Sequence, residues 1–256
     1  MPAAAQTIDA FHRGRFFLVQ PGDRGHRAGM DAMMLAAAVP STFAGRLADF
    51  GAGAGAAGLA VAARCPEAEI VLVEREPDMA AFAAATLALP ENAHLAPRLS
   101  AISADVALAG RQRAAAGLAD RTFDFVIMNP PFNSARHRAS PDALRQAAHV
   151  MPDGGLGAWL RSAAAVLRPR GGLALIARPE ALGAILAGLE GRFGGAAILP
   201  VLPRPDRPAI RIVVRARRGS KAALSLMPPL AMHEAGDRFS AEADAINNGR
   251  ASLFGD

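Results

Sequence analysis

Tyrosine is absent from this chain of 256 residues, and cysteine, lysine and tryptophan each occur only once. The single Cys65 excludes an intrachain disulfide and a cysteine-based metal cluster. The six histidines have no short paired spacing of the zinc-binding kind, so no metal is expected. The longest stretches without a charge, 32–45 and 50–63, are too short for a membrane-spanning helix. Met1–Asp9 lacks the pattern of a secretory signal, and we expect a cytoplasmic protein.

Nearly all of the positive charge of the chain comes from arginine. The chain has 28 Lys+Arg against 23 Asp+Glu, a net charge of +5, and only Lys221 is a lysine. Arginine does not titrate below pH 12, which explains a computed pI of about 10.9. Codon bias in a GC-rich genome would produce this composition, and so would selection for a polyanionic partner. With 52% hydrophobic and 20% charged residues, the chain can bury a core and is not globally disordered.

Short apolar runs alternate with alanine- and leucine-rich stretches from about residue 46 onward, which predicts a parallel α/β sheet with helices on both faces. The expected strands are 46–50, 69–74, 99–103, 123–128, 172–177, 196–202 and 210–216. The expected helices are 32–39, 56–64, 78–89, 106–118, 156–167 and 179–189, with a short one after Ser240. Pro203–Pro208 is too short for a helical crossover, so the last of the seven strands should run antiparallel.

No repeat or flexible linker divides the chain, and we expect a single domain over 1–256. It would consist of an N-terminal segment (1–45), a core (46–220) and a C-terminal tail (221–256). Gln20–Asp31 is predicted to be a loop.

The segment after the first expected strand, residues 49–58, reads DFGAGAGAAG and is called the glycine loop below. It contains both G-x-G-x-x-G, typical of pyrophosphate sites, and D-x-G-x-G-x-G, found in S-adenosylmethionine sites. Glu74 ends the second strand, where a carboxylate can accept hydrogen bonds from ribose hydroxyls. A nucleotide-like cofactor is therefore expected. The alternative for the glycine loop is a turn without a ligand, and the alternative for Glu74 is a solvated strand end. The residues assigned to the cofactor are Asp49, Gly51, Gly53, Gly55 and Glu74.

Asn129-Pro130-Pro131-Phe132 directly follows the fourth expected strand. Prolines remove donors and leave nearby carbonyls free, so the Asn129 side-chain oxygen and the Pro130 carbonyl can accept both hydrogens of a planar NH₂ group. Phe132 can stack on the base or amide that carries this group. The motif predicts catalysis of methyl transfer to such an amine, with Asn129 also next to the cofactor; the alternative is a proline-rich turn with a buried phenylalanine.

The glycine loop, Glu74, Asp105 and Asn129–Phe132 resemble, in order, the motifs of class I S-adenosylmethionine-dependent amino-methyltransferases. The resemblance implies a Rossmann-like fold with an antiparallel seventh strand. It implies that the glycine loop lies against the methionine part of the cofactor, that Glu74 holds the ribose hydroxyls and that Asp105 lies at the adenine. A helix N-cap is the alternative role for Asp105.

The segment 20–40 is similar to the opening of the tRNA(Val) adenine-N6 methyltransferase family, whose members methylate the adenine just 3′ of the anticodon. The tail resembles that family as well, at Pro228–Leu230 and His233–Ser240. This resemblance places Arg27, Gly29 and Asp31 near the methionine end of the cofactor. The chain departs from the family in having N-P-P-F where N-P-P-Y is frequent, and in having His149-Val150 where an acidic residue is expected.

Arginines gather after the N-P-P-F motif, on the expected substrate side. Residues 192–221 contain eight cations and one acid, whereas 131–178 contain seven arginines and two acids. Basic residues at such positions can meet phosphates around a flipped base. The residues expected to bind RNA are Arg136, Arg138, Arg204 and Arg207.

The sequence thus predicts transfer of a methyl group from S-adenosylmethionine to adenine N6 in tRNA. Guanine-N2 methylation of ribosomal RNA and glutamine methylation of a protein remain alternatives, since each target presents a planar NH₂ group. A non-catalytic RNA-binding protein and a nicotinamide-dependent oxidoreductase that uses Gly53–Gly58 are the other two hypotheses.

Overall fold

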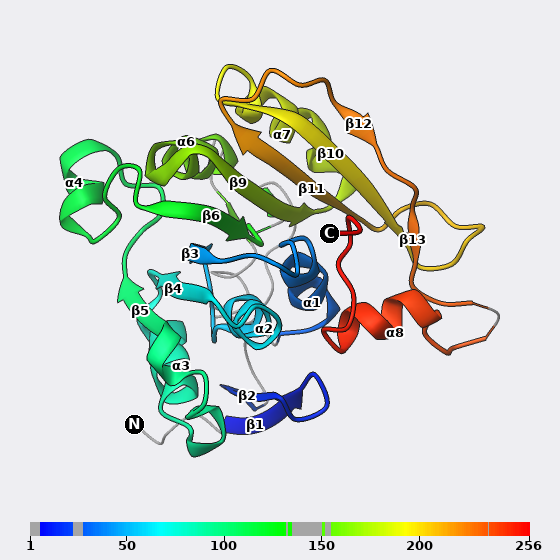
Figure 1. The fold of residues 1–256 in the computed structure, drawn as a ribbon, viewed down its shortest axis with the longest axis horizontal. Helices are drawn as coiled ribbons and strands as arrows, with labels where there is room; N and C mark the ends of the chain where they lie inside the picture. Colours follow the sequence, from blue (N-terminus) through cyan, green and yellow to red (C-terminus); the bar gives the residue numbers. More distant parts are fainter. Residues whose placement is uncertain (1–5, 23–27, 132, 135–149, 152–154, 235) are drawn as a thin grey trace.

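A computed structural model describes residues 6–22, 28–131, 133–134, 150–151, 155–234 and 236–256 (Figure 1). Arg27, Phe132, Arg136 and Arg138 lie outside these ranges.

Seven strands form the centre of the molecule, in the order β5-β4-β3-β6-β9-β11-β10 (Figure 1). Neighbours among β5, β4, β3, β6 and β9 are parallel, whereas β11 is antiparallel to both β9 and β10. The bounds are β3 (Gly45–Phe50), β4 (Ala68–Glu74), β5 (Leu99–Ser103), β6 (Phe123–Met128), β9 (Leu167–Ala177), β10 (Phe193–Leu202) and β11 (Arg211–Arg218). The predicted α/β fold with a reversed last strand is confirmed.

The central strands are buried on both sides, as their continuous apolar runs require. Alternate side chains enter two separate cores: Leu47 and Ile127 face one, Ala48 and Val126 the other. The first core is covered by α1 (Met30–Ala37), α2 (Ala56–Arg64), α3 (Pro77–Leu87) and α8 (Ala241–Asn247). The second core is covered by α6 (Gly155–Val166) and α7 (Leu182–Leu189), with α4 (Gly110–Ala115) beside it. Three short 3₁₀ helices lie at η1 (Pro90–Asn92), η2 (Ala96–Arg98) and η3 (Pro179–Ala181).

One predicted helix is much shorter than expected. The interval 106–118 contains only α4, because Gly110 and Gly117 both adopt positive φ angles, +53° and +92°. Alanine content favoured a longer helix, but left-handed glycines break the α-helical path at each end.

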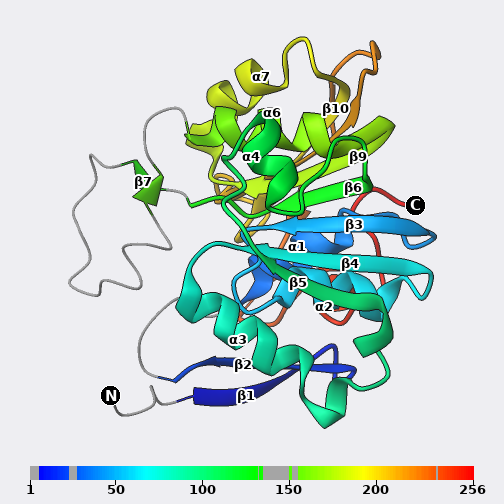
Figure 2. The same cartoon turned by 90° about the vertical axis from the view of Figure 1, so that its left-hand side faces the viewer.

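The N-terminal residues form a hairpin that the sequence did not reveal, β1 (Gln6–Phe11) paired with β2 (Phe16–Pro21). The predicted loop therefore starts later, since Gln20 and Pro21 belong to β2. The other edge of β2 is satisfied by side chains: the Val19 N–H donates to Thr86 Oγ1 (2.9 Å), and the Phe17 N–H donates to Asn92 Oδ1 (2.9 Å). Figure 2 shows the hairpin beneath α3.

The C-terminal tail extends the seven strands to a nine-stranded sheet. Two short strands, β12 (Ser225–Leu226) and β13 (Leu230–Ala231), pair in parallel with β10. Another short parallel pair, β7 (Asn133–Ser134) and β8 (Val150–Met151), follows β6.

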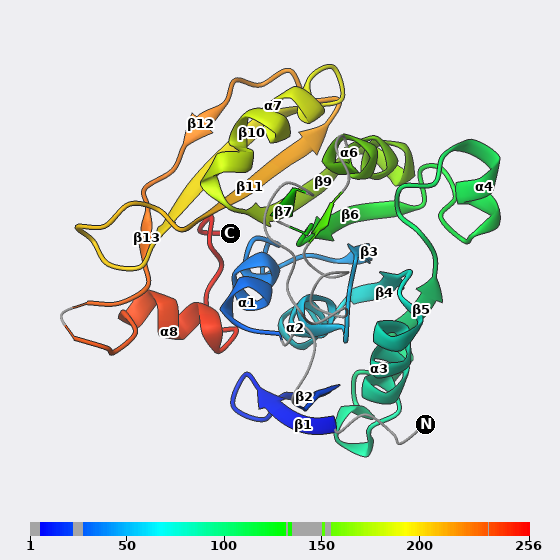
Figure 3. The ribbon, with the colours of Figure 1, turned by 180° about the vertical axis from the view of Figure 1, so that it is seen from behind.

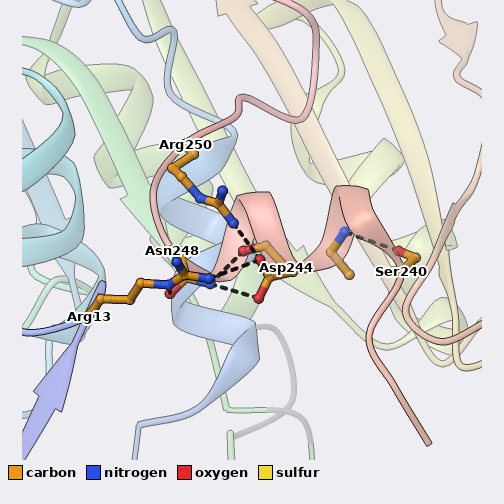
Figure 4. Close-up of polar contacts among 6 residues, drawn as sticks. Arg13, Ser240, Asp244, Asn248 and Arg250 are labelled. Carbon is orange, nitrogen blue, oxygen red and sulfur yellow. Dashed lines mark hydrogen bonds and ion pairs between the residues drawn. The ribbon is translucent and has the colours of Figure 1, made fainter.

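Helix α8 begins where the sequence predicts, after Ser240, whose Oγ accepts the Ala243 N–H at 3.1 Å. It lies next to α1 (Figure 3). Figure 4 shows Asp244 of α8 between Arg13 of the hairpin turn and Arg250. The two ends of the described chain are thus joined by polar contacts. Within the described ranges, no helix is long and apolar enough to cross a membrane.

Candidate functional site

The parallel register brings the expected site residues to one edge of the sheet. Phe50 pairs with Met128, and Phe50 also pairs with Val73, so three strands end side by side. Gly51, Glu74 and Asn129 follow or end these strands at the same edge. Ligands of open α/β sheets bind outside the carboxyl ends of the strands.

The glycine loop takes a left-handed path that only glycine adopts without strain. Gly51, Gly53 and Gly55 have φ angles of +70°, +56° and +96°. The N–H groups of Gly51 and Ala52 both donate to the Val73 carbonyl, at 2.9 and 3.1 Å. The loop is therefore tied to the end of β4 and leads directly into the N-terminus of α2.

Glu74 anchors this loop through its carboxylate. Its Oε2 accepts the Gly53 N–H at 2.8 Å, and its Oε1 accepts the N–H groups of Arg75 (2.8 Å) and Glu76 (2.9 Å). A carboxylate has about four acceptor positions, so these three bonds leave one on Oε2. That position is suited to a hydroxyl group.

Asp49 lies beneath the loop, buried, with Oδ2 accepting the Gly58 N–H at 2.9 Å. The pKa of Asp49 is raised to about 7, chiefly by burial and in smaller part by the nearby charge of Glu74, while the hydrogen bond from Gly58 opposes the shift. Asp49 thus ties the end of β3 to the first turns of α2, and its predicted role towards the cofactor stays a prediction.

The Asn129-Pro130-Pro131 segment leaves β6 at the same edge. Asn129 Oδ1 is buried, and within the described residues no donor reaches it. A buried acceptor without a partner costs roughly 1–3 kcal/mol, and a donor from a bound molecule or from an ordered water would satisfy it. Phe132, the predicted stacking residue, lies outside the described residues.

Asp105 does not cap a helix, since α4 starts only after Ala109. Its Oδ1 accepts the Ala107 N–H at 2.8 Å, and its Oδ2 lies 3.5 Å from Arg75 Nη1. The alternative role as an N-cap is therefore wrong. Because Arg75 directly follows Glu74, the ion pair links the ends of β4 and β5.

The N-terminal segment reaches the same edge through α1. Gly29 is its N-cap residue, and Asp31 in its first turn forms an ion pair with Arg211 (2.8 Å) at the start of β11. Gln20 is buried and bridges two segments, donating to Asp9 Oδ2 (2.7 Å) and accepting the Ala28 N–H (2.6 Å). Gln20 thus ties the hairpin to the residue that precedes the N-cap of α1.

Several arginines of the basic segment 192–221 are engaged within the protein. Arg204 donates to the Glu234 and Gly236 carbonyls and pairs with Asp237 at 3.1 Å. Two more pair with distant carboxylates, namely Arg211 with Asp31 and Arg215 with Asp256. Arg207 is different: its side chain is 66% exposed, and Asp206 lies 4.0 Å away. The sequence count therefore overstates the positive charge available to a partner.

Two residues that the sequence reasoning missed lie against the glycine loop. A Cβ atom on Gly51 would lie 2.6 Å from Trp159 Cη2 of α6, and one on Gly53 would lie 3.5 Å from Met79 Cε of α3. No spacing in the sequence pointed to either. The only available signal was the single tryptophan in the chain.

A comparison with known protein families gives a match over more than half of the chain. Residues 27–199 match the model of the family described as "Methyltransferase small domain". The chain belongs to this family. This methyltransferase uses S-adenosylmethionine as its cofactor, and it has the Rossmann-like class I fold. No curated protein matches its sequence.

A solved structure described as a predicted O-methyltransferase, protein Atu636 from Agrobacterium tumefaciens, is 43% identical to this methyltransferase. The alignment covers 87% of this chain and 98% of the other, with a TM-score of 0.76. TYW2 from P. horikoshii, in complex with MeSAdo, has a TM-score of 0.54 at 11% identity and covers 85% of this chain and 73% of its own. TYW2 from M. jannaschii, in complex with AdoMet, has a TM-score of 0.56 at 10% identity and covers 85% and 88%. The TYW2 structures share the fold.

Proposed function

We propose that this methyltransferase transfers the methyl group to the exocyclic N6 of an adenine in tRNA. The observation that carries the proposal is the buried Asn129 Oδ1, for which the described residues supply no donor. A planar NH₂ group of the substrate would donate one hydrogen to this oxygen and the other to the Pro130 carbonyl. Resemblance to the tRNA(Val) adenine-N6 family, through segment 20–40 and the C-terminal tail, supports the choice of RNA.

Asn129 and Pro130 would act by orientation. An amine conjugated to a ring is a poor nucleophile, and accepting both of its hydrogens favours a lone pair that points out of the ring plane. The cofactor supplies an electrophilic methyl group on a positively charged sulfur. With such a donor bound, the amine's lone pair would form the N–C bond as the C–S bond breaks, the C–S bonding electrons would stay on sulfur, and the extra proton on nitrogen would leave to water. No side chain has to remove a proton from the amine before the transfer. Phe132 would hold the adenine ring by stacking.

The cofactor would lie along the carboxyl edge of β3, β4 and β6. The glycine loop would contact its methionine part, and the remaining acceptor position on Glu74 Oε2 would take a ribose hydroxyl. Asp105 would lie at the adenine. Arg27, Gly29 and Asp31 would close the methionine end, a role supported by the ion pair that fixes the first turn of α1 at this edge.

For RNA contacts we propose Arg136, Arg138 and the exposed Arg207. Arg204 would contribute to RNA binding mainly by holding Glu234, Gly236 and Asp237, to which its guanidinium is bonded.

O-methylation is the second candidate, because the relative from Agrobacterium tumefaciens is described as a predicted O-methyltransferase. A hydroxyl has one hydrogen to donate, whereas the Asn129 oxygen and the Pro130 carbonyl together provide two acceptors. The pair therefore favours an NH₂ group. A planar NH₂ also occurs in guanine and in glutamine, and nucleoside or peptide analysis of the product would distinguish these targets.

The deciding experiment is transfer of a labelled methyl group to total tRNA from a strain that lacks this protein, followed by nucleoside analysis. We expect N6-methyladenosine. Asn129→Ala should abolish transfer while keeping the affinity for S-adenosylhomocysteine within about threefold of wild type, since Asn129 orients the amine rather than the cofactor. Labelled 2′-O-methylated nucleosides, or full activity of Asn129→Ala, would refute the proposal.

Thermal stabilisation by S-adenosylhomocysteine but not by NAD would exclude an oxidoreductase, and stabilisation without any transfer would indicate a non-catalytic RNA-binding protein.

A further inference from the structure

Trp159 lies edge-on against the backbone of Gly51, the first glycine of the glycine loop. A Cβ atom on Gly51 would be 2.6 Å from Trp159 Cη2 and 3.2 Å from Cζ3, so the indole occupies the space that any larger residue would need. The ring is half-buried and packs on the second core. This contact joins α6 to the loop after β3, more than a hundred residues earlier in the chain.

The helix that carries Trp159 is packed tightly against α7. Leu160, the next residue, is fully buried, and a Cβ atom on Gly188 of α7 would lie 2.4 Å from Leu160 Cδ1. Helices α6 and α7 are therefore packed closely at the level of Trp159.

Gly51 is held from the other side as well. Its N–H donates to the Val73 carbonyl at 2.9 Å, and its φ of +70° is a left-handed conformation. Gly51 is thus clamped between the end of β4 and the indole ring. Since Phe50 pairs with Met128, this clamp is adjacent to the point where Asn129 leaves β6.

We propose that Trp159 is a positioning residue of the cofactor site, which holds Gly51 in its left-handed turn so that the loop is already shaped when the cofactor binds. Rigid support of this kind lowers the ordering cost of binding. The inference rests on the proposed function in one respect, the assignment of the glycine loop to the cofactor.

Intrinsic fluorescence provides the first test, because Trp159 is the only tryptophan and no tyrosine is present. Titration of the wild-type protein with S-adenosylhomocysteine should change the emission with a midpoint that equals the Kd from calorimetry. Binding seen by calorimetry without any change in emission would overturn the proposal. This measurement requires no variant and therefore does not depend on the folding of one.

Variants provide the second test. Trp159→Ala should raise the Kd for S-adenosylhomocysteine about tenfold or more, a loss of roughly 1.4 kcal/mol, whereas Trp159→Phe should restore most of the affinity. Val166→Ala is the matched control on the same helix, at a fully buried residue about two turns from Trp159: it should lower the Tm but leave the Kd within about twofold of wild type. Equal affinities of Trp159→Ala and wild type would overturn the proposal.

A double-mutant cycle tests the contact itself. Gly51→Ala should weaken binding more in the wild-type background than in Trp159→Ala, because the smaller residue leaves room for the new methyl group. Additive effects would overturn the proposal.

Failure of the inference is distinguishable from failure of the proposed site. If Glu74→Ala weakens binding and Trp159→Ala does not, only the role of Trp159 is wrong. If neither substitution weakens binding, the glycine loop is not the cofactor site.

Discussion

Asp49 is the buried carboxyl group whose protonation responds to pH near neutrality. Folding removes it from water and places it close to Glu74, so its pKa is raised from 3.8 to about 7. The unfolded chain therefore releases a proton at a lower pH than the folded protein does. The contribution of Asp49 to stability is complete below about pH 4 and is lost as the pH rises towards 7.

Asp49→Asn should remove this pH dependence, because the amide oxygen can still accept the Gly58 N–H and carries no charge. As the pH rises from about 5 to about 8, wild type should lose stability and the variant should not, so the Tm of the variant minus that of wild type should increase. The corresponding change in the difference between their free energies of unfolding is on the order of a few kcal/mol. Thermal denaturation at several pH values measures the effect. A Tm difference that stays constant over this range would contradict it.

Glu74→Gln should weaken cofactor binding, since one carboxylate oxygen is replaced by an NH₂ group that faces backbone N–H groups. We expect a Kd for S-adenosylhomocysteine about tenfold higher by calorimetry, together with a lower Tm. Glu76→Gln is the matched control. Its carboxylate pairs with Arg75, and its Kd should match wild type.

At the scale of elements, the hairpin turn and the end of α8 are packed without spare room. His12 is buried at 3% exposure, and the pKa of this histidine is lowered to about 4 by burial and by the charges of Arg15 and Arg64. A Cβ atom on Gly249 would lie 2.5 Å from His12 Nδ1 and 3.1 Å from Arg64 Cγ. Gly249 is also left-handed, with φ +66°.

Gly249→Ala should therefore destabilise the protein by about 2 kcal/mol or more, the sum of left-handed strain and a steric clash with the buried His12. Gly191→Ala isolates the strain, because Gly191 has a φ of +70° and open space around it. Its cost should be about 1 kcal/mol. Urea denaturation of both variants gives the comparison, and equal losses would show that the contact with His12 is without effect.

Most elements could be predicted because their signals are local. The apolar runs of β3, β4, β6 and β9 and the short Pro203–Pro208 connection were sufficient for the sheet and its reversed strand. The hairpin β1–β2 was missed because β2 is stabilised by distant side chains, Thr86 and Asn92. Pairings of this kind leave no periodic pattern in the sequence.

The candidate site was predicted only as far as backbone motifs allow. The positions of Gly51, Glu74 and Asn129 follow from strand ends, which alternation locates well. The contact of Trp159 with Gly51 depends on how α6 packs, and the three amide partners of Glu74 depend on the path of the loop. Whether these residues bind the cofactor as expected stays a prediction.

At the scale of the whole molecule, net charge is a poor guide to RNA binding because many arginines are already paired. For a single-stranded RNA, the logarithm of the binding constant falls linearly with the logarithm of the salt concentration, and each phosphate contact removed makes this slope shallower by about 0.7. Arg207→Ala should reduce the slope by about this amount and leave the Tm unchanged. Arg215→Ala should lower the Tm and leave the slope unchanged, because Arg215 pairs with Asp256 and lies 4.3 Å over Phe254. Filter binding at several salt concentrations measures both, and equal slopes for Arg207→Ala and wild type would contradict the proposed contact.

The ion pair between Asp31 and Arg211 joins residues that are 180 positions apart. During synthesis the first turn of α1 is made early, but the arginine that fixes it emerges from the ribosome only near the end. A nascent chain can fold β3, α2 and β4 before then, as these are close in sequence, and α1 can pack on α2, but the ion pair that holds its first turn must wait for β11. The N-terminal side of the candidate site is therefore among the last parts to be secured, and a nascent chain that stops before residue 211 would hold the first turn of α1 without this ion pair.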